Sequence, residues 1–81
     1  MVDYLKVLGD NVRAARAELG VSQEELGLET GIDRTYISGI ERGKRNPSLK
    51  VITQIAERLK TTPSELLKVA EEIRQGNFPS L

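Results

Sequence analysis

The stretch QEELGLETGIDRTYISGI, residues 23–40, carries the strongest structural signal in this 81-residue chain. It predicts two short helices joined by a tight turn with Gly31 at its centre. Glycine suits this position because it adopts the positive φ angle of a sharp turn without steric cost. The stretch therefore predicts a helix-turn-helix. The spacing alone also fits an ordinary helical hairpin with no ligand.

Capping signals place the neighbouring helices. Ser22 and Glu25 form a capping box that opens the first helix of the pair, and Asp33 caps the second, which runs to about Arg42. A helix over about residues 4–19 precedes them. Gly9 leaves residues 1–8 open as either an N-terminal extension or the start of that helix. Its apolar stripe consists of Leu5, Leu8, Val12, Ala15 and Leu19.

Two further helices follow the pair. One starts at Pro47 or Ser48, and the other is capped by Thr62 and runs to Gly76. The stripe of the first is Leu49, Ile52, Ile55, Ala56 and Leu59. No strand signal or internal repeat appears. We therefore expect an all-α, five-helix domain over residues 1–81, with a C-terminal tail at 76–81.

Composition narrows the function classes. The chain has no Cys and no His, 38% apolar residues and 30% charged residues. A disulfide framework and a thiolate metal site are excluded, and the commonest general base is missing. No apolar run approaches the roughly 20 residues of a membrane span, and the N-terminus lacks a signal-peptide pattern. We expect a cytoplasmic protein that is not an enzyme and has no membrane contact, metal, cofactor or small-molecule ligand.

Charge is unevenly distributed although the net charge is zero. Residues 1–33 hold three basic and seven acidic side chains. Residues 34–50 hold five basic side chains against Glu41 alone. A neutral protein of this kind can still present one basic face to a polyanion such as DNA. A chance cluster of charges is the alternative.

The outer side of the helix after Gly31 carries candidate base contacts. Ile37 and Ile40 should face the core, which leaves Arg34, Thr35 and Ser38 near the exposed N-terminal half. Arg34 offers a bidentate fork to guanine, Thr35 a contact to a thymine methyl group, and Ser38 a hydroxyl. Gly39 fits either a close approach of DNA or tight packing against another helix.

Candidate phosphate contacts flank that helix. Gln23 stands at a helix N-terminus, where backbone N–H groups favour an anion. Lys44, Arg45 and Asn46 lie in the loop that follows. Together they would hold the DNA backbone on both sides of the groove, although a solvated loop is the simpler alternative.

From about Gly9 to Leu67 the chain resembles the lambda-Cro/434-repressor (XRE) class of helix-turn-helix domains. The matching runs are RAELGVSQEEL (16–26), GIDRTYISGIERGKRNPS (31–48) and IAERL (55–59). The resemblance implies a transcriptional regulator of double-stranded DNA, with Tyr36 at the DNA backbone and the other site residues as above. It also implies an ion pair between Arg16 and Glu41. Gly27 departs from the family, which more often has alanine there.

The run DRTYISGIER, residues 33–42, especially resembles controller proteins of restriction–modification systems. Such proteins are small dimers that regulate their own operon. A homodimer on an inverted-repeat operator is therefore expected, because a single module gives limited specificity. Its interface is predicted at Leu66, Leu67, Val69, Ala70, Ile73 and Phe78. The alternative is that the apolar residues of the last helix fill the monomer core.

Other assignments stay open. Glu24, exposed at the start of its helix, could contact RNA polymerase if the protein activates transcription. An antitoxin or a phage-type repressor would show the same DNA-binding features. A helical adaptor would use the same surface to bind protein, and it would lack the steep salt dependence of phosphate contacts.

Overall fold

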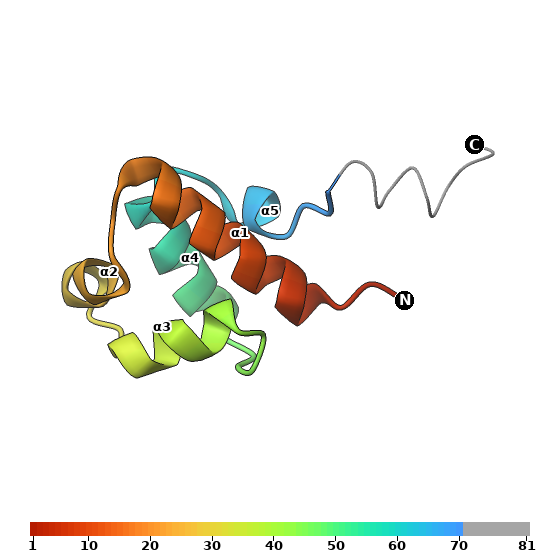
Figure 1. Cartoon of the computed structure of the whole chain (residues 1–81), viewed down its shortest axis with the longest axis horizontal. Coiled ribbons are helices and arrows are strands. Elements are labelled where there is room, and N and C mark those ends of the chain that lie inside the picture. Colours follow the sequence, from red (N-terminus) through yellow and green to blue (C-terminus); the bar gives the residue numbers. More distant parts are fainter. Residues whose placement is uncertain (71–81) are drawn as a thin grey trace.

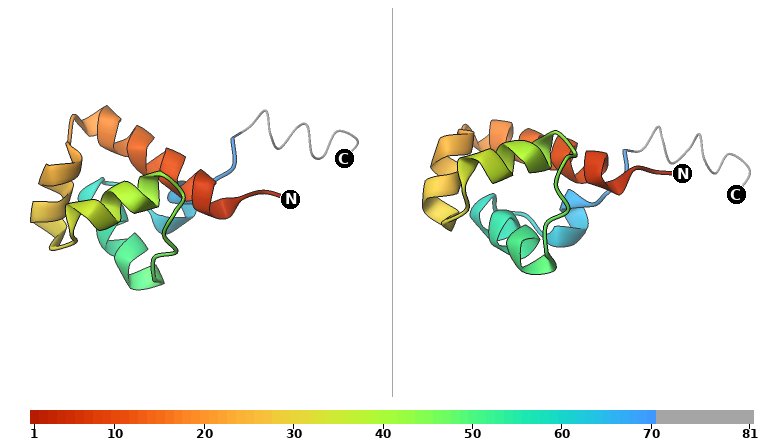
Figure 2. Two further views of the ribbon diagram at one scale, coloured as in Figure 1. Left: turned by 60° about the horizontal axis from the view of Figure 1, so that its bottom comes forward. Right: turned by 90° about the horizontal axis from the view of Figure 1, so that it is seen from below.

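The computed structural model describes residues 1–70. This range contains five α-helices and no strand, which confirms the predicted all-α class. In Figure 1, α1 crosses the front of the molecule and α4 and α5 lie behind it. In the left panel of Figure 2, α3 comes to the front and α4 lies below it. None of these helices is long and apolar enough to cross a bilayer. The bounds are α1 Tyr4–Leu19, α2 Gln23–Thr30, α3 Arg34–Glu41, α4 Leu49–Arg58 and α5 Pro63–Leu66.

The helix starts are fixed by side chains that satisfy free backbone N–H groups. Ser22 Oγ accepts from the N–H of Glu25 at 3.0 Å, and Glu25 Oε1 accepts from the N–H of Ser22 at 3.0 Å. Asp33 caps α3 by accepting from the N–H of Thr35 at 2.7 Å. Asp3 caps α1 in the same way, so residues 4–8 form the start of this helix and residues 1–3 precede it.

A tight turn connects α2 and α3. Gly31 ends α2 with a φ of +75°, a conformation that costs glycine little. In Figure 1, α2 is seen nearly end-on while α3 lies lengthwise, so the two helices cross steeply. This is the helix-turn-helix arrangement that residues 23–40 predict.

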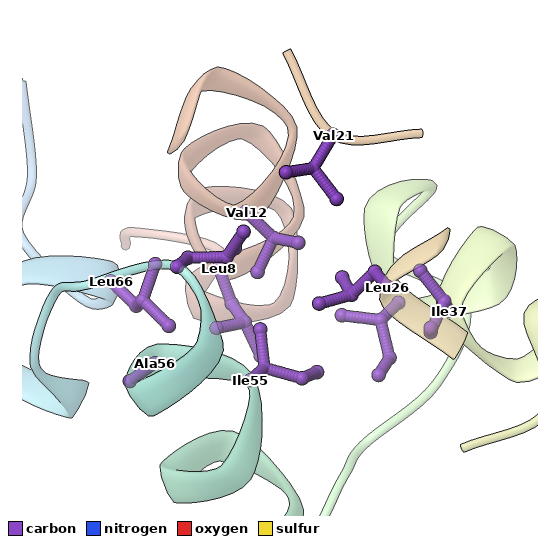
Figure 3. Close-up of a cluster of buried hydrophobic side chains, with 10 residues drawn as sticks. Leu8, Val12, Val21, Leu26, Ile37, Ile55, Ala56 and Leu66 are labelled. Atoms are coloured by element: carbon purple, nitrogen blue, oxygen red, sulfur yellow. The ribbon is translucent and has the colours of Figure 1, made fainter. Parts of the chain in front are cut away.

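One hydrophobic core joins all five helices. Leu26, Ile37 and Ile40 have no exposed surface, and Ile32 is partly buried against them. Figure 3 shows side chains from α2 and α3 meeting those of α1, α4 and α5. Because one face of α3 is committed to this core, its opposite face must point to solvent. The other buried members are Leu8, Val12, Val21, Ile55, Ala56, Leu59 and Leu66.

Two apolar residues at the ends of helices lie outside the core. Leu49 is 69% exposed and Leu19 is 41% exposed, so these two members of the apolar stripes do not reach the core. Leu49 is the first residue of α4 and Leu19 is the last residue of α1. The side chains therefore lie beyond the helix segments that face the core.

The fifth helix is much shorter than predicted. It ends at Leu66, and Val69 and Ala70 are not helical. The side chain of Asn11 in α1 donates to the carbonyl of Leu66 at 2.8 Å and to that of Lys68 at 3.0 Å. A continuing helix needs the Leu66 carbonyl for its own next turn. The contact with α1 thus replaces helix propagation.

The predicted dimer interface changes accordingly. Leu66 is 2% exposed and belongs to the monomer core, so placing it at an interface was wrong. Leu67 and Ala70 are exposed and Val69 is half-buried. Ile73, Phe78 and the end expected at Gly76 lie outside the described residues.

Gly9 allows α1 and α3 to approach closely. A Cβ atom at this position would lie 2.5 Å from the carbonyl oxygen of Ile40 and 2.6 Å from that of Glu41. Both neighbours are backbone atoms and cannot rotate away.

Gly27 has a similar place beside the turn, where a Cβ atom would lie 2.7 Å from the carbonyl oxygen of Ile32. The close approach gives a physical reason for glycine at Gly27, where the family more often has alanine.

Candidate nucleic-acid interface

The outer face of α3 is polar and uncovered by other described elements. Arg34 and Thr35 are exposed, and Ser38 is partly exposed one turn further along. The right panel of Figure 2 shows α3 lying across the front of the molecule. The burial of Ile37 on the inner side fixes this orientation. The three predicted base-contacting residues are thus brought together on the outer face of one helix.

The loop after α3 is held against the helix. The N–H of Lys44 donates to the carbonyl of Gly39 at 2.8 Å. The guanidinium of Arg45 lies 5.5 Å from the centre of the Tyr36 ring, within the range of a cation–π contact. Lys44, Arg45 and Asn46 are all exposed. The loop therefore continues the exposed face of α3.

Arg45 also explains the glycine at Gly39. A Cβ atom on Gly39 would lie 2.6 Å from Cγ of Arg45. The space above the glycine is occupied by this loop side chain. Neither alternative raised by the sequence, a DNA contact or a helix contact, describes that packing.

The basic residues of the 34–50 segment are all exposed. Within residues 1–70, none of the basic side chains of the 34–50 segment forms an ion pair within 4.0 Å. The one acid of this segment, Glu41, is 3% exposed and points toward α1. It does not neutralise the outer face. The basic residues are Arg34, Arg42, Lys44, Arg45 and Lys50.

Glu41 is the centre of a buried polar cluster behind this face. Arg16 donates to its carboxylate twice, from Nε to Oε2 at 2.8 Å and from Nη2 to Oε1 at 3.0 Å. Arg16 also donates to the carbonyl of Val21 at 2.9 Å. The ion pair that the resemblance implies is therefore present in the structure. It ties α1 to the end of α3.

Two further side chains join the cluster that the sequence did not indicate. Gln23 at the start of α2 donates from Nε2 to Glu41 Oε1 at 3.1 Å. Arg13 donates to the backbone carbonyl of Glu41 at 3.1 Å, and its Nε lies 3.6 Å from Oε1. The sequence did offer one signal for Glu41: it is the single acidic residue among the basic residues of the 34–50 segment, which fits a paired role. Nothing in the spacing identified Gln23 as a third partner.

The cluster sets the protonation of Glu41. Burial by itself would raise the pKa of this carboxyl group. Hydrogen bonds from Arg16 and Gln23 and the charges of Arg16 and Arg13 together outweigh burial and hold the pKa below its ordinary value. The hydrogen bond to Glu41 raises the pKa of Arg16 in turn. At the start of α3, the backbone N–H of Thr35 lowers the pKa of Asp33.

The lowered pKa of Glu41 predicts acid destabilisation. A carboxyl group with a lower pKa in the folded state stabilises the fold above its unfolded pKa, and this contribution is lost as the pH falls through the folded value. We expect the urea concentration at the midpoint of unfolding to decrease once the pH is below about 5. Urea titrations between neutral and acid pH, followed by circular dichroism, measure this. A Glu41→Gln variant should show a smaller fall, and an equal fall would contradict the assignment to Glu41.

Comparisons with known proteins agree with this geometry. Residues 12–66 match the family model HTH_3, described as Helix-turn-helix. The chain is 44% identical to the control protein C.BamHI of Bacillus amyloliquefaciens, in a match that covers 83% of this chain and 85% of that protein.

Solved structures show the same fold. The restriction–modification controller protein C.AhdI of Aeromonas hydrophila is 44% identical with a TM-score of 0.73, covering 76% of this chain and 94% of that one. The controller protein C.Esp1396I, solved as a tetramer in complex with its natural 35 base-pair operator, is 33% identical with a TM-score of 0.70. That match covers 84% of this chain and 100% of the other.

Proposed function

This chain belongs to the HTH_3 family of helix-turn-helix proteins, and from that premise we propose that it is a sequence-specific transcriptional regulator rather than an enzyme. It binds double-stranded DNA as a homodimer and acts in the cytoplasm on nucleoid DNA. The resemblance to the XRE class and to restriction–modification controllers is confirmed by the family match and by the relatives C.BamHI and C.AhdI.

The exposed face of α3 is the observation that carries the proposal. A recognition helix meets base edges with its N-terminal residues. Arg34 would bind guanine through a bidentate fork, Thr35 a thymine methyl group, and Ser38 a base or a phosphate. The flanking residues Gln23, Tyr36, Lys44, Arg45 and Asn46 would contact the sugar-phosphate backbone and fix the register.

Homodimerisation would supply the rest of the specificity. A single module buries roughly 600–1,000 Å² on DNA, and two modules related by a two-fold axis read two half-sites. The relative C.Esp1396I is a tetramer on its operator, which supports an oligomeric regulator here. Of the predicted interface residues, the exposed Leu67 and Ala70 and the half-buried Val69 remain candidates within the described range.

The genes under control would be those of a restriction–modification operon, including the regulator's own gene. Support comes from the relatives, which are named as control proteins of such systems. Coupled dimerisation and DNA binding would make regulation depend on protein concentration. The control would thus need no separate ligand-binding domain.

Selection of bound duplexes from a randomised DNA pool, followed by sequencing, tests the proposal. We expect enrichment of an inverted repeat whose spacing matches a two-fold symmetric dimer. Folded protein that enriches no sequence would contradict sequence-specific binding. It would favour the helical adaptor instead.

Arg34→Ala should weaken binding to the selected operator by about 1–3 kcal/mol and relax the preference at one base in each half-site. The reason is the loss of a bidentate contact from an exposed side chain at the first position of α3. Fluorescence anisotropy on the operator and on single-base variants measures both effects. Equal weakening on every sequence would show that Arg34 contacts phosphate only.

A further inference from the structure

The side chain of Gln23 is held in one orientation by Glu41. The amide nitrogen Nε2 lies 3.1 Å from Oε1 of the carboxylate. An ionised carboxylate only accepts hydrogen bonds, so the nitrogen of the amide must face it. The lowered pKa of Glu41 keeps the carboxylate ionised at neutral pH. One N–H of the amide is therefore engaged, and the second is directed elsewhere.

The position of Gln23 makes this orientation relevant to DNA. Gln23 is the first residue of α2, and its side chain is only partly buried. Backbone N–H groups at a helix start already favour an anion such as phosphate. An amide fixed at this point presents a further donor without losing rotamer freedom upon binding.

Arginine side chains offset the charge of the Glu41 carboxylate. Arg13 and Arg16 both lie against Glu41, with nitrogen–oxygen distances of 3.6 Å and 2.8 Å. Arg13 also lies 3.9 Å from Asp10, which pairs with Lys6 at 3.3 Å. The three basic and two acidic side chains leave this cluster with a net positive charge. Arg13 is 53% exposed at its side chain and carries this charge to the surface.

We propose that Glu41 is a positioning residue for DNA binding: its carboxylate orients the Gln23 amide so that the second N–H donates to a DNA phosphate. The inference rests on the proposed function. It gives Glu41 a role in DNA binding in addition to its role in the stability of the fold. The same carboxylate that joins α1 to α3 through Arg16 would prepare the phosphate contact of α2.

A double-mutant cycle tests the proposal. Gln23→Met removes the amide and keeps the side-chain length. The second change in the cycle replaces both members of the ion pair, Arg16→Met together with Glu41→Met. Replacing a whole buried ion pair by apolar residues is tolerated better than removing one member. The probe is a duplex of about 30 base pairs with arbitrary sequence at low salt, where phosphate contacts dominate affinity.

In the wild-type background, Gln23→Met should weaken binding about tenfold, as expected for a hydrogen bond to a charged group. In the Arg16→Met/Glu41→Met background, it should weaken binding by less than about twofold, because the amide is no longer oriented. Gln54→Met, the same change on α4, should leave affinity unchanged in both backgrounds. A tenfold effect of Gln23→Met in both backgrounds would overturn the positioning role while the proposed function stands.

A measurement on the unaltered protein keeps the test valid if the paired variant does not fold. The two side-chain N–H protons of Gln23 should give separate NMR signals, and addition of the duplex should shift mainly the one that does not face Glu41. Equal shifts of both protons, or of neither, would overturn the proposal. Failure of the unaltered protein to bind any duplex would instead overturn the proposed function itself.

Discussion

Glu41→Ala should lower the free energy of unfolding by about 3–4 kcal/mol, the range expected when one partner of a buried ion pair is removed. The variant leaves Arg16, whose side chain is 18% exposed, without its carboxylate. It also leaves Gln23 without its acceptor. Part of the loss is recovered because Arg13 is exposed and can turn to water. Urea denaturation followed by circular dichroism measures the change.

A second Arg–Glu pair on the same chain provides the control. Arg58 donates to Glu29 at 2.6 Å, but these side chains are 30% and 49% exposed. Removal of a solvated pair costs less than about 1 kcal/mol, so Glu29→Ala should change stability little. Similar losses for Glu29→Ala and Glu41→Ala would show that burial does not decide the strength of the Arg16–Glu41 pair.

Gly9→Ala should destabilise the protein by about 2–3 kcal/mol, toward the upper end of what overpacking costs. Helix propensity predicts the opposite sign, because alanine is favoured over glycine by up to about 1 kcal/mol within a helix. The added Cβ atom would meet the carbonyl oxygen of Ile40 at 2.5 Å. Relief requires α1 and α3 to move apart, which disturbs the core. Equilibrium unfolding in urea gives the sign directly.

Gly39→Ala is the matched change. Its Cβ atom would also meet a neighbour at 2.6 Å, but this neighbour is Cγ of Arg45, on a flexible and exposed side chain. Arg45 can move aside, so the stability should change by less than about 1 kcal/mol. If Gly9→Ala were as mild as Gly39→Ala, the helix crossing at Gly9 would be looser than the structure shows.

The sequence predicted the elements whose signals are local. The capping box at Ser22, the cap at Asp33 and the turn at Gly31 depend on residues a few positions apart, and α2 and α3 lie where these signals place them. The exposed face of α3 followed from the burial of Ile37 and Ile40. Local capping signals and apolar periodicity were sufficient to predict α2, α3 and the exposed face of α3.

The errors arose where a distant partner decides the structure. The end of α5 depends on Asn11, which is 55 positions away from Leu66 in the chain. The exposure of Leu49 depends on whether another element covers it, and periodicity does not report this. The link between Gln23 and Glu41 joins two helices across a turn. Residue spacing predicts which residues share one face of a helix, but it does not predict which distant residues contact that face.

The division of α3 into a buried and an exposed side has an evolutionary consequence. Arg34 and Thr35 are exposed and Ser38 is partly exposed, and none of them belongs to the core cluster. Substitutions at exposed positions usually change stability by less than about 0.5 kcal/mol. If these three residues read the bases as proposed, a copy made by gene duplication would acquire a new target sequence through them without losing its fold. The inner side, with Ile37 and Glu41, would have to stay unchanged while this divergence proceeds.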